Sequence, residues 1–265
     1  MMKTIKFLFF LACSISLFSF YSKTNSFSAK TIQKDVVIVE DNLYASKHEV
    51  SNKLYRQFLQ ELIASGKTEE YAKARVDTAQ WDMGKSYFEP MKKLYHSHPA
   101  YDNYPVVNVS ADGAKLFCEW LTEKYNSTAH RKYQKVIFRL PTKDEWTSAA
   151  KGGNLEAVYP WNGQYMRNKK GLFMCNFKQV GNGDAANSDD AFILTVVDAY
   201  WPNNYGLYNM SGNAAELLAD GTHAIGGSWI DPEEMMRIDN DVNVVEFQSA
   251  KPYIGFRYFM EIVEK

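Results

Sequence analysis

A globular domain of mixed helices and strands, with little regular secondary structure, is the fold class that the sequence predicts. Short β-branched runs alternate with helical patterns up to about residue 150, and beyond it Gly, Asn, Asp and Pro interrupt almost every apolar run. The chain is 46% hydrophobic and 15% aromatic, which is typical of a packed core and not of a disordered chain. We therefore expect residues 151–260 to form irregular loops on a few short strands, and compact irregular structure of that extent usually surrounds ligands.

Charge and cysteine content exclude several classes of function. The 265 residues include 30 Lys and Arg against 31 Asp and Glu. A nucleic-acid-binding surface needs a basic excess or stripe, so no nucleic-acid partner is expected. Three cysteines are too few for a disulfide framework or a multi-cysteine zinc module.

Residues 1–22 are expected to be a signal peptide. Lys3 and Lys6 precede an apolar run over residues 7–20, which is shorter than the roughly 20 residues of a membrane span. Cys13 follows Leu-Ala and is a candidate for lipid attachment; the alternative is ordinary cleavage further on, after Ser28. The expected location is the periplasm or the outer membrane, with membrane contact only through a lipid on Cys13.

In the first part of the domain we expect two strands, a helix and an insertion. Residues 36–39 and 43–49 have strand character, and Ser51 is a plausible N-cap for a helix. The apolar positions that recur at helical spacing after this cap are Leu54, Tyr55, Phe58, Leu59 and Leu62. Residues 64–104 are polar and irregular and are expected to form a surface insertion.

The middle of the chain predicts two more strands and two more helices. Residues 105–109 and 136–140 are strand candidates. Ser110 is expected to cap a helix whose apolar face carries Cys118. Thr142 is expected to cap a helix over residues 143–150 that ends at Gly152-Gly153.

Eight segments in order resemble the formylglycine-generating-enzyme (sulfatase-modifying factor) domain family. They are Glu49–Asn52 with Tyr55 and Phe58; Tyr104–Ser110; Cys118–Leu121; Arg139–Thr142 with Glu145-Trp146; Tyr159–Trp161; Asn203–Asn213; Gly226–Trp229; and Gly255–Arg257. The resemblance covers residues 36–262 and implies a modified C-type-lectin-like α+β fold.

A narrower resemblance concerns residues 161–178 and 200–215. They are similar to the domain as it occurs in gliding-motility and type IX secretion lipoproteins of the GldK/PorK type. This implies protein partners in the cell envelope, such as components of a secretion ring.

The copper chemistry of the family is not expected here. The resemblance implies two copper-binding cysteines downstream of the Gly-Gly-Ser motif, and a cuprous ion prefers such soft thiolates. The same spacing from Ser228 reaches Asp231 and Met236. Cys118 and Cys175 have no cysteine partner at motif spacing, so no catalytic residue is assigned and enzyme activity is not favoured.

Calcium is the ion that the resemblance implies. Its first site matches Asn209, Gly212, Ala214 and Glu216, and its second matches Asn176, Phe177, Asp190 and Phe192. Oxygen ligands of these kinds suit calcium, with Gly212 and Ala214 supplying backbone carbonyls. The alternative is a turn that holds no ion.

Three functions remain open from the sequence. The first is an exported, non-catalytic scaffold or binding domain stabilised by calcium and linked to gliding motility or type IX secretion. The second is a metal-dependent oxidoreductase of the sulfatase-modifying-factor family, with another metal arrangement near Asp231 and the histidines. The third is calcium-dependent carbohydrate binding. The pair His96 and His98 is interpreted as part of a solvated loop.

Overall fold

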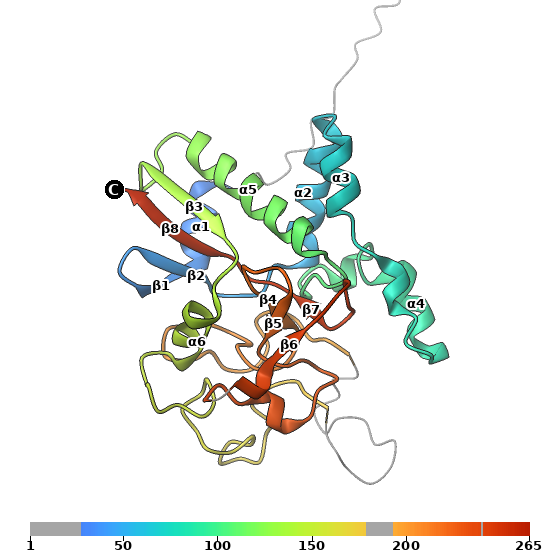
Figure 1. The fold of residues 1–265 in the computed structure, drawn as a ribbon, viewed down its shortest axis with the longest axis vertical. Helices are drawn as coiled ribbons and strands as arrows, with labels where there is room; N and C mark the ends of the chain where they lie inside the picture. The colour runs from blue at the N-terminus through green and yellow to red at the C-terminus, as the bar shows by residue number, and fades with distance from the viewer. Residues whose placement is uncertain (1–27, 179–192, 240) are drawn as a thin grey trace, which may run out of the picture.

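The computed structural model describes residues 28–178, 193–239 and 241–265, and its larger sheet is an antiparallel layer built from both ends of the domain (Figure 1). The strands are β1 (Val36–Glu40), β2 (Leu43–Ser46), β3 (Lys135–Arg139) and β8 (Phe259–Glu264), in the order β1-β2-β8-β3. β2 pairs with β8 through Tyr44 opposite Met260, and β3 pairs with it through Phe138 opposite Met260. β8 therefore joins the first hairpin to the middle of the chain.

Helices cover both faces of this sheet. α5 (Ala111–Ser127) packs along β3, with α1 (Ala29–Asp35) and α2 (Asn52–Ala64) beside it (Figure 1). α6 (Lys143–Lys151) contributes Trp146 to the core on the other face, next to Phe259. The expected caps are confirmed, because Ser51, Ser110 and Thr142 each accept a hydrogen bond from a first-turn backbone N–H. Gly152 ends α6 in the left-handed conformation.

Residues 64–104 lie mostly at the surface, as expected, but the prediction that they are irregular is wrong. The segment forms α3 (Thr68–Ala74), α4 (Glu89–Leu94) and the short 3-10 helices η1 (Thr78–Trp81), η2 (Ser86–Phe88) and η3 (Pro99–Tyr101). It also builds a core of its own, since Trp81, Phe88 and Tyr95 are buried and pack with Trp229. Trp81, Phe88 and Tyr95 are spaced too irregularly to show the period of a helix or a strand, so the sequence pattern did not predict that they are buried.

The strand expected over residues 105–109 is not formed. Only one bridge is present, between Pro105 and Ser51, and Asn108 has a φ of 59°, which interrupts any extended run. Val106, Val107 and Val109 are nevertheless buried. The run of apolar residues therefore indicated a buried segment correctly, but the segment is not a strand. The second strand is also shorter than expected, because it ends at Ser46.

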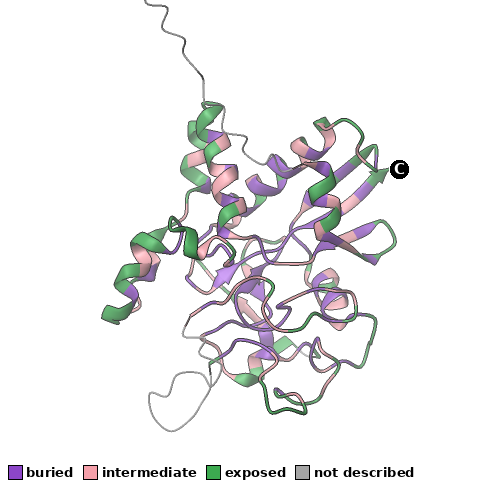
Figure 2. Ribbon diagram, turned by 180° about the vertical axis from the view of Figure 1, so that it is seen from behind, coloured by how far each residue is buried: buried purple, intermediate pink, exposed green. Residues whose placement is uncertain are grey.

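A second, smaller sheet supports the irregular half of the domain, as expected. Its order is β6-β5-β4-β7, and β4 pairs with β7 in parallel. The strands are β4 (Ala215–Leu217), β5 (His223–Ile225), β6 (Val244–Glu246) and β7 (Ile254–Gly255), with η4 (Glu233–Met236) and η5 (Asp241–Asn243) between β5 and β6. Buried positions run through the surrounding loops as well as through the sheets (Figure 2). Among the described residues, no helix has the length and apolarity to cross a bilayer.

Candidate functional site

The turn at residues 209–213 brings the two predicted ion-binding loops together. Asn209, Gly212 and Asn213 all have φ between 51° and 76°, so the chain reverses tightly. A Cβ on Gly212 would stand 2.2 Å from the carbonyl oxygen of Asn176, which only glycine avoids. The Asn213 N–H also donates to that carbonyl at 2.8 Å. The first loop therefore packs directly on the start of the second.

Glu49 is the carboxylate at the centre of this region, and sequence reasoning did not assign it a role. The amide groups of Asn209 and Asn213 donate to it at 2.8 and 2.9 Å, and the Ala214 N–H donates at 3.3 Å. Burial raises the pKa of Glu49 to about 8, and the nearby Glu216 carboxylate adds to this effect. A cation bound beside Glu49 would favour its charged form and so oppose both causes of the raised pKa.

Glu216 is held by two partners of its own. Arg257 binds it in a bidentate ion pair, with Nε and one terminal nitrogen each 2.6 Å from a carboxylate oxygen. The Trp146 indole N–H donates to the same carboxylate at 2.6 Å. Both Glu216 and Arg257 are almost fully buried. Much of the negative charge of Glu216 is therefore already compensated within the protein.

The donor set around the turn still fits a hard cation. Among the described residues, the buried side-chain oxygen of Asn176 has no hydrogen-bond partner, a costly condition that a bound ion would relieve. Within the described ranges no three His, Cys, Asp or Glu side chains converge as a metal site, so amide and carbonyl oxygens would supply most ligands. Phe177 and Ala214 are buried nearby, whereas Asp190, Phe192 and Cys13 lie outside the described residues.

The two positions expected for copper-binding cysteines do not form a thiolate pair. Asp231 accepts a hydrogen bond from Ser228 at 2.5 Å, and burial raises the pKa of Asp231. Met236 is fully buried in a small cluster with Met166, Cys175, Tyr159 and Phe177. A hard carboxylate and an enclosed thioether are poor substitutes for two thiolates at a cuprous ion. Gly226 and Gly227, with φ of 101° and 67°, form a tight turn before Ser228.

His96 corrects the interpretation of a solvated histidine pair. The residue is 8% exposed, and Nδ1 lies 3.1 Å from the side-chain oxygen of Asn52. Burial, with a further contribution from Arg56, lowers the pKa of His96 to about 3. His98, by contrast, is exposed. Cys118 is buried on the apolar face of α5, as expected.

Comparison with protein families shows what this arrangement resembles. Residues 19–262 match the model of the sulfatase-modifying factor enzyme 1-like domain. The chain is 30% identical over 210 residues to the inactive C-alpha-formylglycine-generating enzyme 2 of Mus musculus, covering 69% of this chain and 62% of the mouse protein. It is 35% identical over 119 residues to the formylglycine-generating enzyme of Thermomonospora curvata, covering 44% of this chain and 34% of that enzyme. The chain thus spans less than two thirds of these relatives.

Solved structures show the same fold at lower identity. PvdO from Pseudomonas aeruginosa has a TM-score of 0.55 at 19% identity, covering 83% of this chain and 80% of that one. CarF has a TM-score of 0.53 at 22% identity, covering 86% of this chain and 93% of that one. These similarities support a mixed α and β domain and carry no conclusion about activity.

Proposed function

Because the chain belongs to the family of sulfatase-modifying factor enzyme 1-like domains, we propose that it acts as a non-catalytic binding or scaffold domain and not as a formylglycine-generating enzyme. One observation carries the proposal. Asp231 and Met236 occupy the positions at which the family resemblance places the copper-binding thiolates. Asp231 is hydrogen-bonded to Ser228, and Met236 is packed in an apolar cluster. The name of the mouse relative, an inactive enzyme, is compatible with this role.

The proposal includes calcium as a structural ion. In the first predicted site, Asn209 and Glu49 would hold the ion with backbone carbonyls of the 209–216 loop, since Glu216 is already paired with Arg257. In the second predicted site, the Asn176 side-chain oxygen would be a ligand. Its role would be to join the two loops by neutralising buried oxygen atoms. The alternative of a turn without an ion predicts no effect of calcium on stability.

The proposed setting is the cell envelope, with a link to gliding motility or type IX secretion. Its support is the apolar run at residues 7–20 after Lys3 and Lys6, together with the similarity of residues 161–178 and 200–215 to secretion lipoproteins. Affinity purification from membranes of the source cell, followed by mass spectrometry, tests this setting. Recovery of secretion-ring proteins supports it, and their absence from purifications that retain other envelope partners contradicts it.

A copper-binding comparison tests the non-catalytic role directly. The wild type and the double variant Asp231→Cys with Met236→Cys are titrated with Cu(I) against a chromogenic chelator, and each is incubated with a sulfatase-type cysteine peptide. We expect no stoichiometric Cu(I) and no aldehyde product from the wild type. We expect at least a gain of Cu(I) binding in the double variant, because it regains two thiolates. Aldehyde formation by the wild type would overturn the proposal in favour of an oxidoreductase.

A further inference from the structure

A loop formed by residues 165–173, the basic loop, projects from the irregular half of the domain on the side away from α5 (Figure 1). Its sequence is Tyr-Met-Arg-Asn-Lys-Lys-Gly-Leu-Phe, with three basic residues and no acid. All 31 Asp and Glu of the chain therefore lie outside the loop, together with the other 27 of its 30 Lys and Arg. The loop concentrates positive charge on a chain whose remainder is acidic.

Hydrogen bonds and a buried anchor fix the conformation of the basic loop. The Asn168 side-chain oxygen accepts from the N–H groups of Lys170 and Leu172, at 2.9 and 3.1 Å. The Asn168 N–H donates to the Leu172 carbonyl at 2.9 Å. Met166 is 4% exposed and packs in the cluster that contains Met236. The loop is therefore preformed, which lowers the entropic cost of binding.

The side chains that the basic loop presents to solvent combine apolar surface with positive charge. Tyr165 is 77% exposed and Leu172 is 52% exposed. Arg167, Lys169 and Lys170 are also exposed. Within the described ranges, no carboxylate, those of η4 included, lies within 4.0 Å of the charged nitrogens of these three residues. Their charge is therefore available to an anionic partner.

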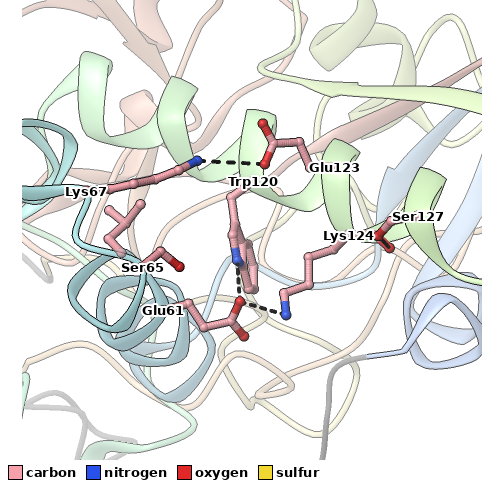
Figure 3. Close-up of a pocket in the computed structure, with 8 residues that line it drawn as sticks. Glu61, Ser65, Lys67, Trp120, Glu123, Lys124 and Ser127 are labelled. Carbon is pink, nitrogen blue, oxygen red and sulfur yellow. Dashed lines mark hydrogen bonds and ion pairs between the residues drawn. The ribbon is translucent and has the colours of Figure 1, made fainter.

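The cavity between α2 and α5 shows the contrast (Figure 3). It measures about 320 Å³ and its charged side chains pair with one another. Lys124 lies 2.6 Å from Glu61, which also accepts the Trp120 indole N–H at 2.9 Å, and Lys67 lies 3.8 Å from Glu123. A ligand would have to break these existing pairs to enter, whereas the basic loop requires no such exchange.

A membrane surface fits the basic loop better than a protein partner does. A specific protein interface usually buries about 800 Å² on each partner, which is more than a loop of this length offers. Cations beside Tyr and Leu side chains are typical of segments that bind anionic membranes, because the cations contact lipid phosphates while the apolar groups enter the headgroup region. A fluid headgroup layer also adapts to the shape of a projecting loop.

We propose that the basic loop docks on the surface of an anionic phospholipid bilayer, with Lys169 and Lys170 at lipid phosphates and Tyr165 and Leu172 among the headgroups. This contact is additional to the lipid on Cys13 that the sequence predicts, and it does not depend on that lipid. A single acyl chain gives only marginal membrane binding, and a basic surface is the kind of second signal that makes attachment stable.

An environment-sensitive fluorophore on Leu172→Cys, in the full chain carrying Cys13→Ser, tests the contact. Cys118 and Cys175 are buried, so the label should react at residue 172. We expect its fluorescence to rise with vesicles of phosphatidylglycerol and phosphatidylethanolamine and not with vesicles of phosphatidylcholine. High salt should reduce the rise, because it screens the attraction. The matched control is Ile63→Cys, at a position of α2 that is 59% exposed, and its label should not respond.

Co-sedimentation with the same vesicles, in the same Cys13→Ser background, measures the contribution of charge. Lys169→Gln with Lys170→Gln should weaken binding about 30-fold, since each basic residue near an anionic surface contributes about 1 kcal/mol. Arg167 is left unchanged because its guanidinium group packs on an aromatic ring within the loop. Lys53→Gln with Lys115→Gln removes the same charge from exposed positions of α2 and α5 and should leave binding nearly unchanged.

Three results would overturn the membrane contact. They are no response of the Leu172 label to anionic vesicles, an equal response of the Ile63 label, and equal losses of binding in the two double variants. A response of the Leu172 label to soluble polyglutamate but not to vesicles would also overturn it, in favour of an acidic protein partner. None of these results would alter the copper and aldehyde measurements, on which the non-catalytic role depends.

Discussion

Glu216 and Arg257 form a buried ion pair that links the small sheet to the hairpin of the larger one. Arg257 also donates to the carbonyl oxygens of Ser46 and Tyr208, so one guanidinium group connects three distant segments. Removing one partner of such a pair leaves the other charge buried and uncompensated. The loss of stability is then larger than the net stabilisation that the intact pair provided.

We therefore expect Glu216→Gln to lower the free energy of unfolding by about 3–5 kcal/mol. The matched control is Glu261→Gln, because Glu261 pairs with Arg139 at 3.0 Å but its side chain is 46% exposed. That change should cost about 0–1 kcal/mol. Urea unfolding of both variants measures the difference, and equal losses would contradict the special role of the buried pair.

His96 makes stability depend on pH in a defined direction. Its pKa is about 3 in the folded protein and about 6.5 in an unfolded chain, so the unfolded state binds more protons between these values. The contribution of a neutral His96 is therefore complete above about pH 6.5 and is lost as the pH falls toward 3. Each pKa unit corresponds to about 1.4 kcal/mol.

The corresponding experiment follows unfolding at pH 7, 5 and 4. Wild type should lose several kcal/mol more over this range than His96→Gln, which cannot become charged. His98→Gln, a change at the exposed neighbour, should titrate like wild type. If His96→Gln and wild type show the same acid loss, the buried neutral histidine is not the cause.

The residues around the 209–213 turn were only partly predictable. Asn209 and Gly212 belong to one local motif and Asn176 to another, and the structure brings the two together. Glu49 lies 160 residues from Asn209 along the chain and immediately before an ordinary N-cap sequence. Nothing local distinguishes it from a surface acid, because its burial depends on tertiary contacts. The pairing of Glu216 with Arg257 was missed for the same reason.

Among the elements, those with end signals in their own sequence were predicted well. Ser51, Ser110 and Thr142 satisfy first-turn N–H groups by local chemistry, so their helices began where the sequence indicated. Strand pairing depends on distant partners, so residues 105–109 looked like a strand while only one bridge formed. The contact between the rings of Phe88 and Trp229 likewise could not be predicted from the spacing of apolar residues.

The 209–213 turn provides a prediction at this scale. Gly212→Ala should be severely destabilising, because the new Cβ would lie 2.2 Å from the Asn176 carbonyl oxygen and the residue has a φ of 76°. Gly66→Ala is the matched control, since Gly66 has a φ of 69° with open space around it. It should cost only about 1–2 kcal/mol of backbone strain. Similar melting temperatures for the two variants would show that the turn is not tightly packed.

For the whole molecule, calcium should act as a stabilising ligand. An ion that binds only the folded state adds about 2.7 kcal/mol when its free concentration is a hundredfold above Kd. At about 2–4 °C per kcal/mol, the melting temperature should rise by several degrees in calcium and fall again on chelation. Glu49→Gln should abolish most of this shift in melting temperature. It should destabilise the calcium-free protein less than Glu216→Gln does, because Glu216 forms a bidentate pair with the buried Arg257 and Glu49 does not.

Differential scanning fluorimetry in calcium, magnesium and chelator makes this measurement, with elemental analysis of the purified protein. Glu61→Gln, at the cavity between α2 and α5, serves as the control and should keep the full calcium shift. Identical melting of wild type in calcium and chelator, with no retained ion, would mean that the turn holds no ion.

The central place of β8 in the larger sheet has a consequence for biosynthesis. β8 lies between β2 and β3, yet it is synthesised after every other strand of that sheet. Until residue 264 has been made, the hairpin and β3 have no strand to join them, and each presents an unpaired edge. A chain that ends before residue 259 would therefore be exposed to proteases and to strand exchange with other chains. The larger sheet can close only after this last segment is available, wherever the domain folds.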